Sequence, residues 1–220
     1  MRILITAGGT REYIDPVRFI SNTSSGRMGY TLATAALKSG HKVIIITTIE
    51  NSKLETQNSK LKIIKVVTAA EMFKAVKKHF RQCDCLIMSA AVADYTPVRR
   101  VKTKIRKQDK TLSIKLKPTA DILKWAGKHK KKDQIVVGFA LEDKAIRNRA
   151  AKKLKEKNLD MIVANTPAAI GADKSTVQIK TPCSGWMKIK NVAKPAIAER
   201  IIAVIEKAIY GNHQRNVRCI

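Results

Sequence analysis

The chain has 220 residues, of which 45% are hydrophobic, 10 are glycine and 6 are proline; this suffices for one domain with a substantial core and excludes collagen-like or long disordered tracts. Lysine and arginine number 44 against 17 acidic residues, a formal net charge of +27 that raises the question of nucleic acid. Because the basic residues are dispersed and only 5% of the chain is aromatic, we expect small polyanions, with nucleic acid unlikely as the primary partner.

No apolar run approaches the ~18 residues that would span a bilayer, and no charged-then-apolar signal segment opens the chain. We therefore expect a soluble, cytoplasmic protein without a membrane partner. The four cysteines, Cys83, Cys85, Cys183 and Cys219, do not have zinc-ligand spacing. We expect reduced thiols and assign no metal ligands.

The first half of the chain alternates strands and helices. The expected elements are a strand over 3–7, a helix over about 26–39, strands over 41–48 and 61–67, a helix ending near residue 80 and a strand over 84–90. The first of these form a β-loop-α-β unit, which requires parallel strands and a right-handed crossover. Ser24 or Ser25 is the expected N-cap of the first helix, and Thr68 with Glu71 resembles a capping box before the second.

The alternation breaks in the middle of the chain. Residues 95–108 are basic and loop-like, and residues 111–116 alternate apolar and polar side chains, which indicates a half-exposed strand. The remaining expected elements are a helix through Ile122, Leu123 and Trp125, a strand over 135–139, a helix over 145–157, a strand over 161–164, an antiparallel pair over 176–181 and 186–191, and a helix over about 195–210. The predicted fold class is α/β: a doubly wound, Rossmann-like, mostly parallel sheet with antiparallel strand insertions. We expect a single domain over 1–220 with a tail over 211–220.

Open parallel sheets bind ligands beyond the carboxyl ends of their strands, where the strand order reverses. Stretches of small or polar residues stand at these ends: 6–9, 88–94, 139–142 and Asn165. The loop 21–29, between the first strand and the first helix, adds hydroxyls, an amide and two glycines. A helix N-terminus offers unpaired N–H groups and partial positive charge, so this loop is predicted to bind a phosphate or a carboxylate.

Several long motifs at these positions resemble, in order, those of phosphopantothenoylcysteine synthetase (phosphopantothenate-cysteine ligase). They are TAGGTRE (6–12), IDPVR (14–18), ISNTSSGRMG (20–29), AAVADY (90–95), KIRK (104–107), DIL (121–123), VGFA (137–140) with Glu142, and residues 153–165. There are two departures. Ala120 stands where the family often has proline before Asp-Ile-Leu, and Gly8-Gly9-Thr10 replaces the Gly-Pro-Thr of many bacterial members.

The resemblance implies a ligase of coenzyme A biosynthesis of the bacterial, CTP-dependent type, assisted by Mg²⁺. 4'-Phosphopantothenate is activated by CTP with release of pyrophosphate, and the amine of L-cysteine then attacks the acyl-cytidylate. The family forms homodimers, with the antiparallel insertion implicated in the contact. The bacterial enzyme is often fused behind a flavin-dependent decarboxylase, and here Met1 directly precedes the first synthetase strand. We therefore expect either a decarboxylase on a separate chain or a fragment of a split gene.

The resemblance also implies residue roles. Asn22, which would bind the intermediate, and Lys104, on a mobile loop, are the catalytic candidates. The expected substrate-binding residues are Asn22, Ser24, Ser25 and Gly26. The expected nucleotide-binding residues are Gly8, Gly9, Met88, Ser89, Ala90, Asp94, Lys104, Ala120, Asp121, Ile122, Leu123, Phe139, Lys153 and Lys157. Independently of the family, Lys153 and Lys157 are four residues apart and so share one helix face, which suits a triphosphate.

Two other classes stay open. An NAD(P)-dependent oxidoreductase also uses a doubly wound sheet, and Glu50 follows the second strand where a ribose-binding acid could stand. Against it, the chain lacks G-x-G-x-x-G, and Arg99, not lysine, stands four residues after Tyr95. A basic nucleic-acid-binding protein is the second alternative, motivated by the net charge alone.

Overall fold

The computed structural model describes residues 1–49, 59–107 and 109–214 of the chain. Its centre is an eight-stranded sheet in the order β12-β11-β10-β9-β6-β1-β4-β5. These strands are β1 (Arg2–Ala7), β4 (Lys42–Thr47), β5 (Leu61–Lys65), β6 (Cys85–Met88), β9 (Ile135–Leu141), β10 (Met161–Asn165), β11 (Lys174–Lys180) and β12 (Met187–Ala193). All neighbours from β5 to β10 pair in parallel, and β11 and β12 extend the sheet antiparallel, as the predicted fold class requires.

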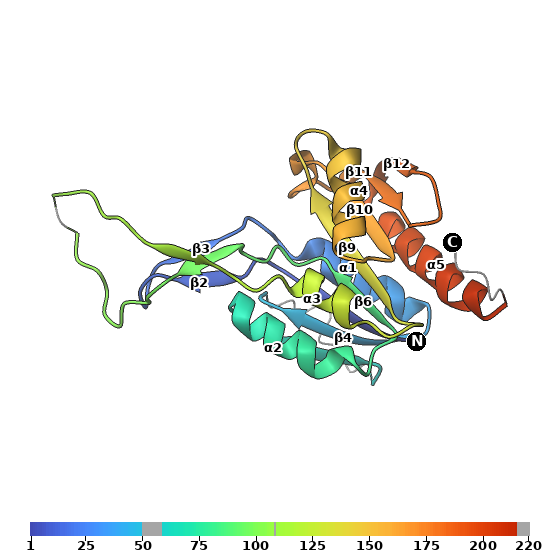
Figure 1. The fold of residues 1–220 in the computed structure, drawn as a ribbon, viewed down its shortest axis with the longest axis horizontal. Coiled ribbons are helices and arrows are strands. Elements are labelled where there is room, and N and C mark those ends of the chain that lie inside the picture. Colours follow the sequence, from blue (N-terminus) through green and yellow to red (C-terminus); the bar gives the residue numbers. More distant parts are fainter. Residues whose placement is uncertain (50–58, 108, 215–220) are drawn as a thin grey trace.

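Helices cover both faces of the sheet (Figure 1). One face packs against α1 (Arg27–Lys38) and α5 (Lys194–Gln214), and the other against α2 (Ala69–Phe80), α3 (Ile122–His129) and α4 (Ile146–Glu156). Successive side chains of β1 alternate between the two cores: Ile3 and Ile5 belong to the first, and Leu4 to the second. This explains why the central strands are nearly continuous apolar runs.

The two predicted N-caps have different outcomes. At α2 the capping box is confirmed, because Thr68 Oγ1 accepts from Glu71 N at 3.2 Å and the Glu71 carboxylate accepts from Thr68 N. At α1 the prediction of a serine cap is wrong: the N-cap is Gly26, with φ at 66°, and no side chain caps the helix. A left-handed residue at this point favours glycine, and Ser24 Oγ instead accepts from Gly26 N at 3.4 Å.

Two short hairpins project from the body of the molecule (Figure 1). One pairs β2 (Arg11–Tyr13) with β3 (Phe19–Ser21), within a stretch predicted as loop, and the other pairs β7 (Tyr95–Pro97) with β8 (Leu116–Pro118). We call residues 11–21 and 95–118, without residue 108, the arm. The predicted strand over 111–116 is wrong except for Leu116. Its alternating pattern has no core to cover within one chain, since Leu112 and Ile114 are exposed.

The cysteine prediction holds for two residues and fails for one. Cys83 and Cys85 are buried free thiols, and burial raises the pKa of Cys83 to about 12. Cys183 is disulfide-bonded, so the prediction of a reduced thiol is wrong there. Cys219 and Glu50 lie outside the described residues. Among the helices that the structure describes, none is both long and apolar enough to cross a membrane.

Candidate active site

A cleft of about 690 Å³ lies at the carboxyl ends of the parallel strands. It opens where the strand order reverses, because from β1 the chain proceeds to β4 and β5 on one side, and β6, β9 and β10 lie on the other. Its walls are the loop 22–29, the loop after β6, the ends of β9 and β10, and residues near the start of β11 and α5. The predicted site residues that line it are Asn22, Ser24, Ser25, Gly26, Ser89, Ala90, Asp94, Phe139 and Lys153.

Two buried threonines fix the loop after β6. Thr6 lies in β1, where its Oγ1 accepts from Ala90 N at 3.2 Å and its carbonyl oxygen accepts from Ser89 Oγ at 2.6 Å. Thr10 Oγ1 accepts from Ala93 N at 2.9 Å. Both threonines are fully buried, so the loop that forms one wall of the cleft is held from the sheet side.

The loop 22–29 forms a neighbouring wall of the cleft and ends at the N-terminus of α1. Asn22 Nδ2 donates to Val92 O at 3.1 Å, which ties the two loops together at the mouth of the cleft. Further in, α1 approaches the sheet closely at Gly29, where an added Cβ would stand 2.5 Å from Ala7 Cβ and 2.9 Å from Ser89 Oγ. The hydroxyls and the helix N-terminus predicted to bind an anion therefore face one cavity.

Two lysines of α4 and its C-cap supply positive charge at this end of the sheet. Lys153 Nζ donates to Phe139 O at 2.8 Å, and Lys157 Nζ pairs with Asp121 Oδ2 at 2.8 Å. The pKa of Lys153 is lowered, first by burial and then by Lys157, although nearby carboxylates, among them Asp94, oppose this. The pKa of Asp121 is also lowered: burial alone would raise it, but the hydrogen bond from Lys157 and other contacts outweigh burial. An anion in the cleft would relieve the repulsion between the two ammonium groups.

Several predicted residues do not line the cleft. Gly8 and Gly9 lie behind the loops, where the Gly8 carbonyl accepts from Ala91 N at 2.9 Å and an added Cβ on Gly9 would stand 2.4 Å from Asn22 O. The remaining ones are the core residues Met88, Ile122 and Leu123, the exposed Ala120 and Asp121 at the start of α3, Lys157 beside them, and Lys104. Lys104 is exposed on the arm.

The structure adds residues that the sequence did not reveal. Lys194, the first residue of α5, lines the cleft with only 6% of its surface exposed, and its Nζ donates to the carbonyls of Ala169 and Ala172. Arg27 pairs with Asp173 at 2.6 Å, so two cations hold the segment 169–173 over the cleft. No local pattern could have identified Lys194, since the antiparallel strands β11 and β12 bring it there.

A metal site made of protein ligands alone is not found in the part of the chain that the structure describes, where no three His, Cys, Asp or Glu side chains cluster suitably. Two carboxylates, Asp94 and Glu142, do line the cleft. Mg²⁺ commonly takes one or two carboxylates together with substrate phosphates. The lining therefore fits an ion that arrives with a nucleotide.

Over residues 1–209 the sequence matches the family described as DNA/pantothenate metabolism flavoprotein C-terminal domain. The chain belongs to this family. It is 47% identical over 181 residues to the coenzyme A biosynthesis bifunctional protein CoaBC of Bacillus subtilis, covering 80% of this chain and 44% of that protein. It is 42% identical over 208 residues to a cysteine/cysteine sulfinic acid decarboxylase of an unknown prokaryotic organism, covering 93% of this chain and 57% of that one.

Among solved structures, the crystal structure of the C-terminal domain of the coenzyme A biosynthesis bifunctional protein CoaBC superposes with a TM-score of 0.79 at 35% identity, covering 96% of both chains. The resemblance that the motifs predicted is thereby confirmed at the level of the family and the fold. The chain spans about half the length of the curated relatives that it matches.

Proposed function

We propose that this chain is a phosphopantothenate-cysteine ligase of coenzyme A biosynthesis and that it uses CTP. The observation that carries the proposal is the cleft itself, in which the loop 22–29, the loop after β6 and Lys153 meet at the reversal of strand order. The similarity to a coenzyme A biosynthesis bifunctional protein, CoaBC, supports a role in the same pathway.

The reaction has two steps. A carboxylate oxygen of 4'-phosphopantothenate attacks the α-phosphorus of CTP, and the bond to pyrophosphate breaks. The amine of L-cysteine then attacks the acyl carbon, CMP leaves, and the amine gives up a proton. Such a reaction needs positioning and charge stabilisation more than acid-base groups, which suits a lining of hydroxyls, backbone N–H groups and a lysine.

Each wall of the cleft has a proposed role. Asn22 and the hydroxyls of Ser24 and Ser25 bind the acyl intermediate, and Lys153 pairs with the phosphates of the nucleotide. Mg²⁺ would be held by Asp94 and Glu142 together with those phosphates, and it would supply charge neutralisation. Burial lowers the pKa of Lys153 most, Lys157 lowers it further, and Asp121, which pairs with Lys157, acts in the opposite direction.

Lys104 is proposed to act on the same polyanion, although it is exposed on the arm and does not line the cleft in this conformation. A loop that closes over substrate is a common means of completing such a site. Lys104→Gln should therefore slow pyrophosphate release. If this loop is only a solvated surface, the rate will not change.

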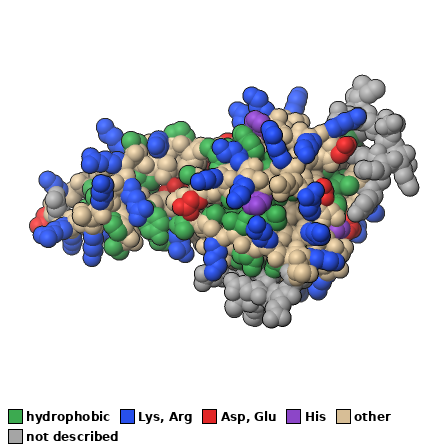
Figure 2. Space-filling model, turned by 90° about the horizontal axis from the view of Figure 1, so that it is seen from below, with side chains coloured by type: hydrophobic (Ala, Val, Ile, Leu, Met, Phe, Trp, Pro, Cys, Tyr) green, Lys and Arg blue, Asp and Glu red, His purple; other side chains and the backbone are tan. Residues whose placement is uncertain are grey.

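We further propose a homodimer formed through the arm. Large apolar side chains are exposed on it, namely Val17, Phe19, Tyr95, Val98, Val101, Leu112, Ile114 and Leu116. Figure 2 shows apolar side chains among the basic ones that are dispersed over this face. An exposed apolar surface of this kind is typical of an interface. Light scattering that gives a monomer mass at micromolar concentration would contradict the dimer.

That a decarboxylase on a separate chain acts on the product of this reaction stays a prediction.

The decisive experiment measures pyrophosphate release with 4'-phosphopantothenate, CTP, Mg²⁺ and L-cysteine, omitting each in turn. Release that does not need phosphopantothenate would overturn the assignment, and faster release with ATP would overturn the choice of CTP. Thermal shift separates the other classes, because a ligand that binds only the folded state raises its stability. CTP with Mg²⁺ should stabilise the ligase, NADH an oxidoreductase, and only RNA or DNA a nucleic-acid-binding protein.

A further inference from the structure

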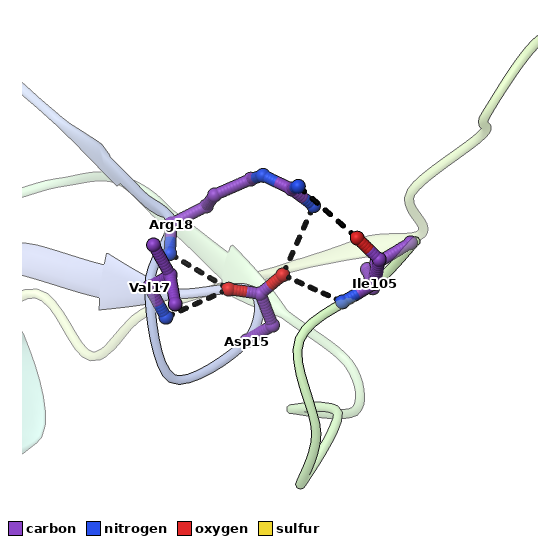
Figure 3. Close-up of polar contacts among 4 residues, drawn as sticks. All are labelled: Asp15, Val17, Arg18 and Ile105. Atoms are coloured by element: carbon purple, nitrogen blue, oxygen red, sulfur yellow. Dashed lines mark hydrogen bonds and ion pairs between the residues drawn. The ribbon is translucent and has the colours of Figure 1, made fainter. Parts of the chain in front are cut away.

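The turn between β2 and β3 contains a fully buried carboxylate, Asp15 (Figure 3). Its Oδ1 accepts from the backbone N–H groups of Val17 and Arg18, at 2.8 and 2.7 Å, and so closes the turn. Its Oδ2 accepts from Arg18 Nη1 and from Ile105 N, both at 3.1 Å. One oxygen therefore serves the turn itself, and the other reaches a segment 90 residues away in sequence.

Arg18 completes the contact with that segment. While its Nη1 binds Asp15, its Nη2 donates to Ile105 O at 3.1 Å, so both polar groups of Ile105, its N–H and its C=O, are bound. A second tie lies close by, where Val101 N donates to Ile14 O at 2.9 Å. The residue directly before Ile105 is Lys104, whose own side chain is exposed. Lys104 therefore extends from a backbone segment that hydrogen bonds hold at Ile105, directly after it, and at Val101, before it.

The charge of Asp15 is suited to this contact. Burial alone would raise its pKa, but the backbone hydrogen bonds from Val17, Ile105 and Arg18, together with the Arg18 guanidinium, hold the pKa below its ordinary value. The carboxylate is therefore ionised at neutral pH. Hydrogen bonds to an ionised acceptor are shorter and stronger than neutral ones.

We propose that Asp15 is a positioning residue for Lys104: it binds Ile105 directly and through Arg18, and so fixes the point from which Lys104 reaches the nucleotide. The inference rests on the proposed function of Lys104. The body of the chain does not hold Lys104 in the cleft, so its reach depends on where the segment 101–107 is anchored. Misplacement of a reacting group by about 1 Å can cost about 100-fold in rate.

The test uses Asp15→Asn in the full-length protein. The amide oxygen can still accept from Val17 and Arg18 and keep the turn. The amide nitrogen takes the place of Oδ2, where it faces two other donors, Arg18 Nη1 and Ile105 N. The contacts of Oδ2 are therefore lost, while those of Oδ1 within the turn remain. Pyrophosphate release should slow by about 10- to 100-fold, with the KM for cysteine unchanged. Hydrogen exchange over residues 101–107 should become faster, while exchange in the sheet stays the same.

A double-mutant cycle separates positioning from general destabilisation. If Asp15 acts through Lys104, Asp15→Asn combined with Lys104→Gln is no slower than Lys104→Gln alone. The matched control is Glu12→Gln, which neutralises another buried carboxylate nearby. Glu12 accepts from Ala69 N at 2.8 Å and serves α2 instead of the segment 101–107. This control should keep its rate.

Four outcomes overturn the inference. Multiplicative losses in the double variant would show that Asp15 and Lys104 act independently. Unchanged turnover of Asp15→Asn, while Lys104→Gln is slow, would refute the positioning role of Asp15 but would not contradict the proposed function. Normal turnover of Lys104→Gln would refute the role of Lys104 and the inference with it, whereas phosphopantothenate-dependent release would still support the ligase. A loss that disappears at higher protein concentration would mean that the turn acts through subunit association.

A second variant keeps the test valid if Asp15→Asn does not fold. Ile105→Pro removes the Ile105 N–H donor and leaves the turn of the hairpin untouched. It should slow pyrophosphate release to a similar extent, and normal turnover of this variant would likewise refute the inference.

Discussion

α1 approaches the sheet closely at Gly29, and Gly29→Ala tests whether this close approach sets the shape of the cleft. The added methyl would stand 2.5 Å from Ala7 Cβ, 2.9 Å from Ser89 Oγ and 3.1 Å from Ala7 Cα. Ala7 is fully buried in β1, and its short side chain cannot rotate away. The helix must therefore move outward, and the N–H groups at its N-terminus move with it.

Two opposing effects determine the change in stability. Overpacking a core costs about 1–3 kcal/mol, whereas alanine in place of glycine within a helix gains about 1 kcal/mol. The expected net loss is at most about 2 kcal/mol, which lowers Tm by up to about 8 °C in a chain of this size. The KM for CTP should rise as well, because Ser89 and Gly29 both line the cleft.

Denaturant unfolding and pyrophosphate release measure the two effects. Gly185→Ala is the control, since an added Cβ there meets nothing within 4 Å, and it should change neither stability nor KM. Ala7→Gly in the Gly29→Ala background removes the Ala7 methyl group with which the new Cβ clashes, and it should lower the KM for CTP again. If Gly29→Ala is as stable and as active as the parent, the close approach of α1 does not govern the cleft.

Three further predictions follow from particular side chains. Asn22→Asp should leave the fold intact and lower kcat, because a carboxylate would oppose an anionic intermediate; unchanged turnover would refute its role. The pKa of Lys153 is lowered and an anionic nucleotide should raise it, so CTP binding at alkaline pH should take up protons, as calorimetry in buffers of different ionisation enthalpy would detect. Cys83, with its pKa raised to about 12, should resist alkylation at pH 8 until the protein unfolds; labelling as fast as that of a small thiol would contradict its burial.

The sequence by itself determined the fold class and most of the elements. Apolar runs such as Ile3 to Ala7 are buried on both faces and so identify parallel strands without tertiary information. The capping box of Thr68 and Glu71 is local, since its partners are three residues apart. The sequence also predicted the loop 21–29 as an anion-binding loop, because its hydroxyls stand next to a helix N-terminus in the chain, and residues 22–29 of it line the cleft.

Only the tertiary structure decided what depends on distant partners. Gly26, and not a serine, is the N-cap of α1, because its φ of 66° favours glycine and an added Cβ would stand only 3.3 Å from Gly8 N. Lys194 reaches the cleft through the antiparallel strands β11 and β12, and Asp15 binds Ile105 across 90 residues. These contacts have no periodicity or spacing in the sequence, because the sheet and the arm, and not neighbouring residues, bring the groups together.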